Sequence, residues 1–338
     1  MPAPDTTSSL AAAATPTHLP RSTRRSWLLT GLKILVTIGL LVFVVWRVDV
    51  RLVLAALSAV RPGRLATAFL WVAVAIVVSA VKWGRILRRR GIDAGLGDLT
   101  RLYYIASFFN AVLPTGIGGD PVRAWLLGRE KRAMPEAFAS VISERLIASA
   151  ALGMSSAIAL PLVGFTPMLA GLVALFIAVD VALVGLFLVP SIGERAVRAV
   201  IPARFPDAAS ATREALVAVR QTLKDWPLVA EVLAYSLVFQ ACVAMVNASL
   251  FWAIGNPVSI GIALVYSPMI STVSMLPISL SGLGVPQAAY AYFFGLSGVP
   301  MAASVAVSLG FFLVVAISTL PGAILFLFAK NEGETDGL

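Results

Sequence analysis

The chain has 338 residues, of which 59% are hydrophobic and 13% are charged, and it carries a formal net charge of +9. Several apolar runs reach the roughly 20 residues that a helix needs to cross a bilayer, so the composition predicts an all-α polytopic membrane protein rather than a soluble one. A single cysteine, Cys242, excludes a disulfide within the chain, and a single histidine, His18, leaves metal ligation and imidazole catalysis poorly supplied. We therefore expect no metal and no other cofactor.

The N-terminal part predicts a tail followed by two crossings. Residues 1–26 are rich in Ala, Thr, Pro and Ser, which is typical of a disordered cytoplasmic tail. Residues 27–46 are bracketed by tryptophans and are too long for the apolar core of a signal peptide, so they should remain as the first crossing. Residues 65–81 predict the second crossing, and the arginines within residues 85–90 that follow it favour a cytoplasmic N-terminus.

A broken apolar element comes next. Residues 103–113 are too short to cross the membrane as a helix. The chain then turns at Pro114 into closely spaced glycines and returns through residues 124–127 toward a basic stretch, which indicates a re-entrant hairpin entered from the cytoplasm. Backbone that leaves a helix at membrane depth survives only where it is buried in protein or lines a wet cavity. This hairpin therefore predicts a functional site.

The rest of the chain predicts further crossings around a basic segment at residues 190–227. Within this segment, residues 208–225 place apolar side chains at helical spacing between charges, which is typical of an interfacial helix or of a soluble connecting helix. Residues 258–276 and 285–294 form either a second hairpin, entered from outside, or two full crossings. The predicted crossings in this part lie at residues 137–162, 168–189, 228–254 and 301–328.

The hairpin interpretation gives about six spanning helices plus two re-entrant helical hairpins, and the alternative gives seven or eight full spans. Two similar hairpins that enter from opposite faces are typical of inverted repeats in transporters, whose sites lie near the bilayer midplane. We expect residues 27–328 to form one transmembrane domain and residues 329–338 to form a polar C-terminal tail.

Charged side chains within the first hairpin mark the candidate site. A charge in hydrocarbon costs at least about 2.5 to 3.5 kcal/mol, so such residues usually face a partner or a cavity. Asp120 and Arg123 are three apart on a helix expected to begin near Pro121, so they share a face. The helix start behind Gly118 and Gly119 suits an anion such as a phosphate. The alternative is that Asp120 only caps the helix and that Arg123 reaches the cytoplasmic surface.

Two more charges, Glu144 and Arg145, lie within the following crossing. As neighbours on a helix they point in different directions, so each needs a partner on another element. Arg145 with Asp120, and Glu144 with Arg123, would make a network across two elements. The alternative is that these charges only hold the hairpin to the following crossing. Removal of one member of a buried pair leaves the other as a buried charge without a partner.

Asp180 lies near the middle of a crossing with no charged neighbour within one turn. Burial favours the neutral form of a carboxylic acid, so Asp180 is a candidate for proton coupling. The alternative is a permanently protonated or hydrogen-bonded side chain. Four uncharged polar residues are candidates for the cavity lining or for bonds between helices: Asn110, Gln240, Asn247 and Gln287.

These polar motifs, taken in order, resemble the lysylphosphatidylglycerol synthase transmembrane family, also called flippase-like integral membrane proteins. The resemblance implies a bacterial or archaeal multi-pass protein that handles or moves lipids, including aminoacylated phosphatidylglycerol and lipid-linked sugars. It covers about residues 27–328. It rests on Asn110, Leu113-Pro114, Gly118-Gly119, Asp120, Arg123, Glu144-Arg145-Leu146 and residues 277–284, a run that contains Gly282 and Gly284.

Two features depart from the family. Gln287 stands where members usually carry an acidic residue, which weakens a charge-based role for that element. Nothing resembling the soluble aminoacyl-transferring domain follows Phe328, so we do not expect lysine transfer.

The leading hypothesis is a flippase of the bacterial cytoplasmic membrane that moves an anionic or lipid-linked substrate between leaflets by alternating access. One rival is a membrane enzyme that uses a lipid-linked sugar, which should carry paired carboxylates in an outer loop where the chain offers only Asp49. Another is a non-transporting partner of a lipid-synthesis enzyme. The basic residues follow the cytoplasmic loops, so nucleic acid is not expected. The headgroup site or gate is expected to include Asn110, Pro114, Gly118, Gly119, Asp120, Arg123, Glu144, Arg145, Gly282, Gly284 and Gln287.

Overall fold

The structure is a computed structural model that describes residues 62–112, 118–162, 166–189, 195, 206–275 and 285–328. All regular elements within these ranges are helices. The predicted tails and the first crossing lie outside the described residues, as do Asp49, Pro114, Gly282 and Gly284. The expectations for these parts therefore stay predictions.

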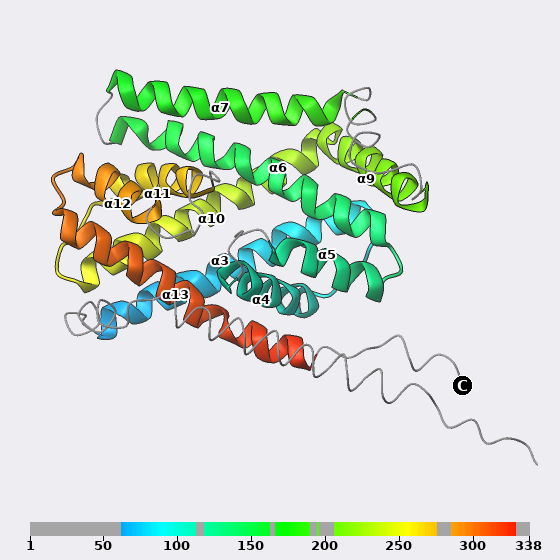
Figure 1. Cartoon of the computed structure of the whole chain (residues 1–338), viewed down its shortest axis with the longest axis horizontal. Helices are drawn as coiled ribbons and strands as arrows, with labels where there is room; N and C mark the ends of the chain where they lie inside the picture. The colour runs from blue at the N-terminus through cyan, green and yellow to red at the C-terminus, as the bar shows by residue number, and fades with distance from the viewer. Residues whose placement is uncertain are drawn as a thin grey trace, which may run out of the picture.

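Long apolar helices form the body of the molecule (Figure 1). Within the described ranges, four are long and apolar enough to cross a membrane, α3 (Pro62–Arg89), α6 (Met134–Ala159, continued by the short turn η1, Leu160–Leu162), α10 (Trp226–Ala253) and α13 (Met301–Leu327). A further apolar helix, α7 (Pro167–Leu188), runs alongside α6 on the outside of the molecule (Figure 1). These helices cover each predicted crossing that falls within the described residues, which confirms an all-α polytopic membrane protein.

Two pairs of shorter helices enter between the long ones. In Figure 1, α4 (Leu96–Val112) and α5 (Gly119–Glu130) lie toward one end of the long helices, and α11 (Ile260–Met275) and α12 (Val285–Gly295) lie toward the opposite end. The members of each pair contact each other. With 16 and 11 residues, α11 and α12 are shorter than the roughly 20 residues of a full crossing. Within the described residues, α11 and α12 are thus as short as the hairpin interpretation expects.

Helix boundaries differ from the sequence prediction around the first hairpin. The predicted end of the second crossing at residue 81 is wrong, because α3 continues to Arg89 and buries Trp83 and Leu87. Similarly, α4 begins at Leu96 rather than at residue 103, and α5 begins at Gly119 rather than near Pro121. The longer α3 carries Lys82 into the interior instead of leaving it at the membrane surface.

Two glycines let other helices approach the backbone of α4. A Cβ atom on Gly119 would stand 1.8 Å from the carbonyl oxygen of Ala106, and one on Gly322 of α13 would stand 2.1 Å from that of Tyr104. Real Cβ atoms do not come this close to backbone, so any side chain at either position would push α5 or α13 away from α4. The first hairpin and the last long helix are therefore fixed against each other by backbone contact.

The described part of the basic segment includes the amphipathic helix α9 (Pro206–Lys224). Its stripe of Ala215, Val219 and Leu223 is buried in one apolar cluster with Ile147 of α6 and Leu228 of α10. The helical spacing predicted for this stripe is confirmed, and the stripe packs on the long helices rather than facing solvent.

Partly exposed polar contacts tie the end of α3 to the junction of α9 and α10. Arg85 pairs with Glu231 at 3.2 Å, and Arg89 pairs with Asp225 at 3.4 Å. We call this the basic end of the molecule, because the arginines of residues 85–90 gather there. Exposed pairs of this kind contribute only about 0–1 kcal/mol each, so they position helix ends more than they stabilise the fold.

Candidate functional site

Five charged side chains from α3, α5 and α6 form a row of alternating sign, which we call the charge cluster. Lys82 Nζ lies 3.0 Å from Glu144 Oε1, and Glu144 Oε2 accepts a hydrogen bond of 2.8 Å from Arg123 Nη1. Arg123 Nη2 lies 3.0 Å from Asp120 Oδ1, and the other carboxylate oxygen of Asp120 accepts from Arg145 Nε at 2.5 Å. The two carboxylates thus each bridge two cations.

The members of the cluster differ in exposure. The side chains of Lys82, Glu144, Arg123 and Asp120 are at most 6% exposed, whereas that of Arg145 is 48% exposed. Arg145 lies near the middle of α6 and not at a helix end, so its exposed surface faces an internal space. Arg145 is therefore the member of the cluster that a ligand can reach.

Two aromatic rings lie against the guanidinium group of Arg123. Its guanidinium carbon lies 4.7 Å from the ring centre of Trp83 and 4.4 Å from that of Tyr103. The Tyr103 hydroxyl donates to Glu144, and Trp83 Nε1 donates to Ser140 at 2.9 Å, so both rings are held in place. Cation–π contacts of this kind strengthen when they are desolvated. The surroundings fix Arg123 in one position.

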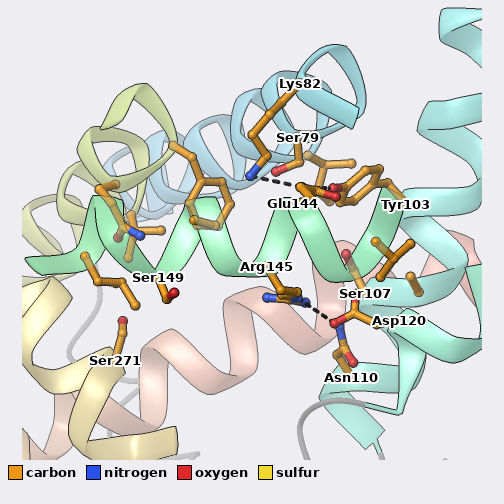
Figure 2. A pocket seen from close by; sticks show the side chains of 18 of the residues that line it. Ser79, Lys82, Tyr103, Ser107, Asn110, Asp120, Glu144, Arg145, Ser149 and Ser271 are labelled. Atoms are coloured by element: carbon orange, nitrogen blue, oxygen red, sulfur yellow. Dashed lines mark hydrogen bonds and ion pairs between the residues drawn. The ribbon is translucent and has the colours of Figure 1, made fainter. Parts of the chain in front are cut away.

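A cavity of about 760 Å³ lies beside the charge cluster. Figure 2 shows Glu144 on one side of α6, toward Lys82, and Arg145 and Ser149 on another side of the same helix. The polar part of the lining comprises Ser79, Lys82, Tyr103, Ser107, Asn110, Asp120, Glu144, Arg145, Ser149, Gln240 and Ser271. The apolar part includes Ile76, Phe138, Ile142, Phe239, Val243, Phe311 and Val315. A mainly apolar cavity with charged groups at one place suits an amphiphilic ligand.

The predicted ion pairs are present. Asp120 pairs with Arg123 and with Arg145, and Glu144 pairs with Arg123. The alternative of a capping Asp120 is wrong, because the helix begins at Gly119, two residues before Pro121, and both carboxylate oxygens bind arginines. The alternative of a surface-facing Arg123 is also wrong, since its side chain is 1% exposed.

The predicted anion site at the start of α5 is changed by Asn110. The side-chain oxygen of Asn110 accepts a hydrogen bond of 2.8 Å from the backbone N–H of Gly119, the first residue of the helix, which follows Gly118. This N–H is one of the donors that a helix start would otherwise offer to an anion. Asn110 therefore closes the hairpin, and it also lines the cavity.

The other polar candidates divide between cavity and packing. Gln240 lines the cavity. Asn247 joins three helices, because its amide nitrogen donates to Ser267 at 2.9 Å and its oxygen accepts from Tyr290 at 2.6 Å. Gln287 lies on α12, outside the cavity lining that the structure describes.

Asp180 of α7 is buried against α6. Its carboxylate accepts a hydrogen bond from the hydroxyl of Ser149, which lines the cavity. Asp180 itself does not line the cavity, so one side chain separates it from that space.

Sequence reasoning missed Lys82, Trp83 and Tyr103. Lys82 looked like the end of a crossing, but the apolar residues Trp83, Ile86 and Leu87 after it continue at helical spacing, which was a readable sign of a longer helix. Tyr103 lies two helical turns before Asn110 on α4 and shares its face, which was a weaker sign. In the part of the chain that the structure describes, no group of three or more His, Cys, Asp or Glu is placed to hold a metal.

The residues of the charge cluster lie in a part of the chain that matches a known protein family. The family model described as the lysylphosphatidylglycerol synthase transmembrane region matches residues 31–322. Neither the curated proteins nor the solved structures compared with the chain give a match. The matched range contains the charge cluster, both hairpins and nearly all of α13, and it confirms the resemblance seen in the motifs. The chain therefore belongs to the family of the lysylphosphatidylglycerol synthase transmembrane region.

Proposed function

We propose that this protein binds an anionic or lipid-linked substrate in its cavity and moves it between the leaflets of the membrane by alternating access. The family and the apolar helices make it a membrane protein linked to lipid metabolism. The observation that carries the proposal is the charge of the cluster, in which three cations and two carboxylates leave one net positive charge. A positive charge away from bulk water attracts an anion more strongly than the same charge in water.

Arg145 is the group that would bind the anion. Its bond to Asp120 uses Nε, so its two terminal nitrogens would be the groups that bind a ligand, and the residue lines the cavity. A guanidinium offers donors in a fixed fork that matches phosphate oxygens. The remaining four members of the cluster would hold Arg145 in place and supply the excess charge. Asn110, Gly118 and Gly119 would shape the hairpin beside them.

The apolar lining supports a lipid rather than a soluble anion. Phenylalanines from α6, α10 and α13 line the cavity beside aliphatic side chains. A volume of about 760 Å³ suits a headgroup and the first part of its chains. The ends of the chains would continue into the bilayer.

The two hairpins support movement between leaflets. Residues of the first hairpin and Ser271 of α11 both line the cavity, so the space lies between elements that enter from opposite ends (Figures 1 and 2). Paired elements of this kind are typical of carriers that open to each side in turn. We place the basic end at the cytoplasm, because basic residues gather on the cytoplasmic side of membrane proteins.

The rival functions have less support. Both carboxylates that line the cavity are held by cations, so neither is free to act as a general base. At the basic end, Arg85 and Arg89 pair within the chain instead of presenting free charges to a partner protein.

Transport of fluorescent phosphatidylglycerol in proteoliposomes tests the proposal. Arg145→Ala removes a charged hydrogen-bond partner of the substrate, so we expect transbilayer movement to slow by about tenfold or more. Arg85→Ala is the matched control, because it removes another arginine of the protein from an ion pair that is partly exposed. The rate of lipid movement in this variant should stay near that of the wild type. An unchanged rate for Arg145→Ala with each anionic lipid tested would contradict the proposed site.

A further inference from the structure

We propose that Asp180 and Ser149 form a proton site next to the cavity, and that the anionic substrate and one proton bind together and move together. This inference rests on the proposed function and names its source of energy. It is carried by the position of Asp180, by the hydrogen bonds of Ser149 and by the charge of the cluster.

Asp180 is the inward-facing polar group of an outer helix. On α7, Leu175 and Val181 are 62% and 63% exposed, whereas Asp180 is 5% exposed because it faces α6. Its recorded partner is the Ser149 hydroxyl, and Ser149 lines the cavity. The carboxyl group is thus shielded from lipid and separated from the cavity by one hydroxyl group.

The hydrogen bonds of Ser149 can adapt to either protonation state of Asp180. The Ser149 oxygen lies within bonding distance of two acceptors, the carbonyl oxygen of Leu146 at 2.9 Å and the carboxylate of Asp180. A serine hydroxyl has one hydrogen, so it donates to only one of them. When Asp180 is protonated, its own O–H donates to Ser149 and the Ser149 hydrogen bonds the Leu146 carbonyl. When Asp180 loses its proton to water in the cavity, Ser149 turns its hydrogen to the carboxylate.

The surroundings of Asp180 favour its neutral form over its ionised form. Among the described helices, those with the main contacts to α7 are α6 and α9. On α6, the nearest cation along the cavity face is Arg145, one turn before Ser149, and it pairs with Asp120. Among the described residues, no cation forms an ion pair with Asp180, and an ionised carboxylate in hydrocarbon is costly. The charged residues of α9 are Asp207, Arg213, Glu214, Arg220 and Lys224, of which Arg220 donates to carbonyl groups at the end of α7.

Charge balance couples the proton to the substrate. With Asp180 neutral, the net positive charge of the cluster is free to be balanced by one anionic headgroup. With Asp180 ionised, a negative charge stands beside the same cavity and weakens the attraction for that headgroup. By linkage, the proton raises the affinity for the anion by the same factor as the anion raises the affinity for the proton. A proton gradient would therefore drive the substrate across the membrane in the same direction as the protons.

Binding of short-chain phosphatidylglycerol to the full chain in detergent tests this coupling. Its phosphodiester stays ionised, so it does not itself titrate between about pH 5.5 and about pH 8.5. For the wild type we expect the affinity to fall about tenfold as the pH rises across this range. At the upper pH, where Asp180 of the free protein is ionised, an indicator dye should report uptake of a proton on binding. Asp180→Asn should bind with high affinity at both pH values and take up no proton. Asp225→Asn, which changes a carboxylate at the start of α10, should keep the wild-type profile.

The outcomes separate the two proposals. Asp180→Asn that binds the lipid but keeps the wild-type pH profile and proton uptake overturns the coupling and leaves the proposed function intact. A wild type that binds no phosphatidylglycerol at either pH overturns both. If Asp180→Asn does not fold, Ser149→Ala keeps the carboxyl group and removes its hydrogen bond. The midpoint of the pH profile should then shift, and an unchanged midpoint overturns the role of this pair.

Discussion

Arg123 and Arg145 carry the same charge in the same cluster, but their surroundings differ. Arg123 lies against the rings of Trp83 and Tyr103 and binds two carboxylates, so its guanidinium is held by both aromatic and ionic contacts. Arg145 has one such bond and a half-exposed side chain. The first arginine is built into the fold, and the second is open to a ligand.

This difference predicts that the same substitution lowers stability by different amounts at the two positions. Arg123→Ala leaves two buried carboxylates short of a partner and should lower the free energy of unfolding by about 3–5 kcal/mol. Arg145→Ala should lower it by less than about 1 kcal/mol, because the side chain is half exposed. Thermal unfolding of both variants in detergent measures the difference. Equal losses of stability would contradict the separation of roles.

At the scale of single elements, close backbone contact fixes the first hairpin. Gly119 begins α5 directly over the Ala106 carbonyl, and its N–H is bound by Asn110. Two features therefore hold α4 and α5 together. Gly119 has no side chain to keep the helices apart, and the side-chain oxygen of Asn110 binds its N–H group. Neither feature depends on the charge cluster, so the closure can be tested separately from the ion pairs.

Gly119→Ala should disrupt this closure. The added methyl group meets backbone at 1.8 Å and forces α5 away from α4, which should cost about 3 kcal/mol of stability. Gly171→Ala on α7 is the control, because a Cβ atom there meets nothing within 4 Å. It should leave the melting temperature unchanged or raise it slightly, since alanine favours a helix. A Gly119→Ala protein as stable as Gly171→Ala would show that the contact is not tight.

The sequence predicted which helices are present better than where each helix begins and ends. The pairing of Arg145 with Asp120 was predictable. The side chains of Glu144 and Arg145 point apart because the two residues are adjacent on one helix, and only a few acidic residues were available as partners for Arg145. The place of Lys82 was not, since its partner Glu144 lies 62 residues later and a cation before an arginine-rich stretch resembles a membrane boundary. The cavity also escaped prediction, because it depends on how side chains from several helices pack together.

At the scale of the whole molecule, the net charge of the cluster belongs to no single helix. Lys82 comes from α3, Asp120 and Arg123 from the first hairpin, and Glu144 and Arg145 from α6. The excess positive charge exists only when these three parts are assembled. A change far from the reachable Arg145 should therefore alter the binding of an anion.

Lys82→Met tests this balance. It leaves two cations and two carboxylates, so the cluster becomes neutral, while Glu144 keeps its bond to Arg123. We expect binding of short-chain phosphatidylglycerol to weaken by about tenfold, although the Lys82 side chain is only 5% exposed. Lys82→Arg keeps the charge and should retain most of the affinity. Wild-type affinity in Lys82→Met, measured by titration calorimetry, would contradict a role for the net charge.

The single bond between Arg145 and Asp120 also links the cavity to the first hairpin. That bond is one of two direct ion-pair ties between the first hairpin and α6, the other being Arg123 with Glu144. An anion in the cavity that bonds the terminal nitrogens of Arg145 would share this guanidinium with Asp120, whose bond uses Nε. One side chain would then join the ligand to the carboxylate of the hairpin, so occupation of the cavity would change the strength of a bond that holds the hairpin to α6.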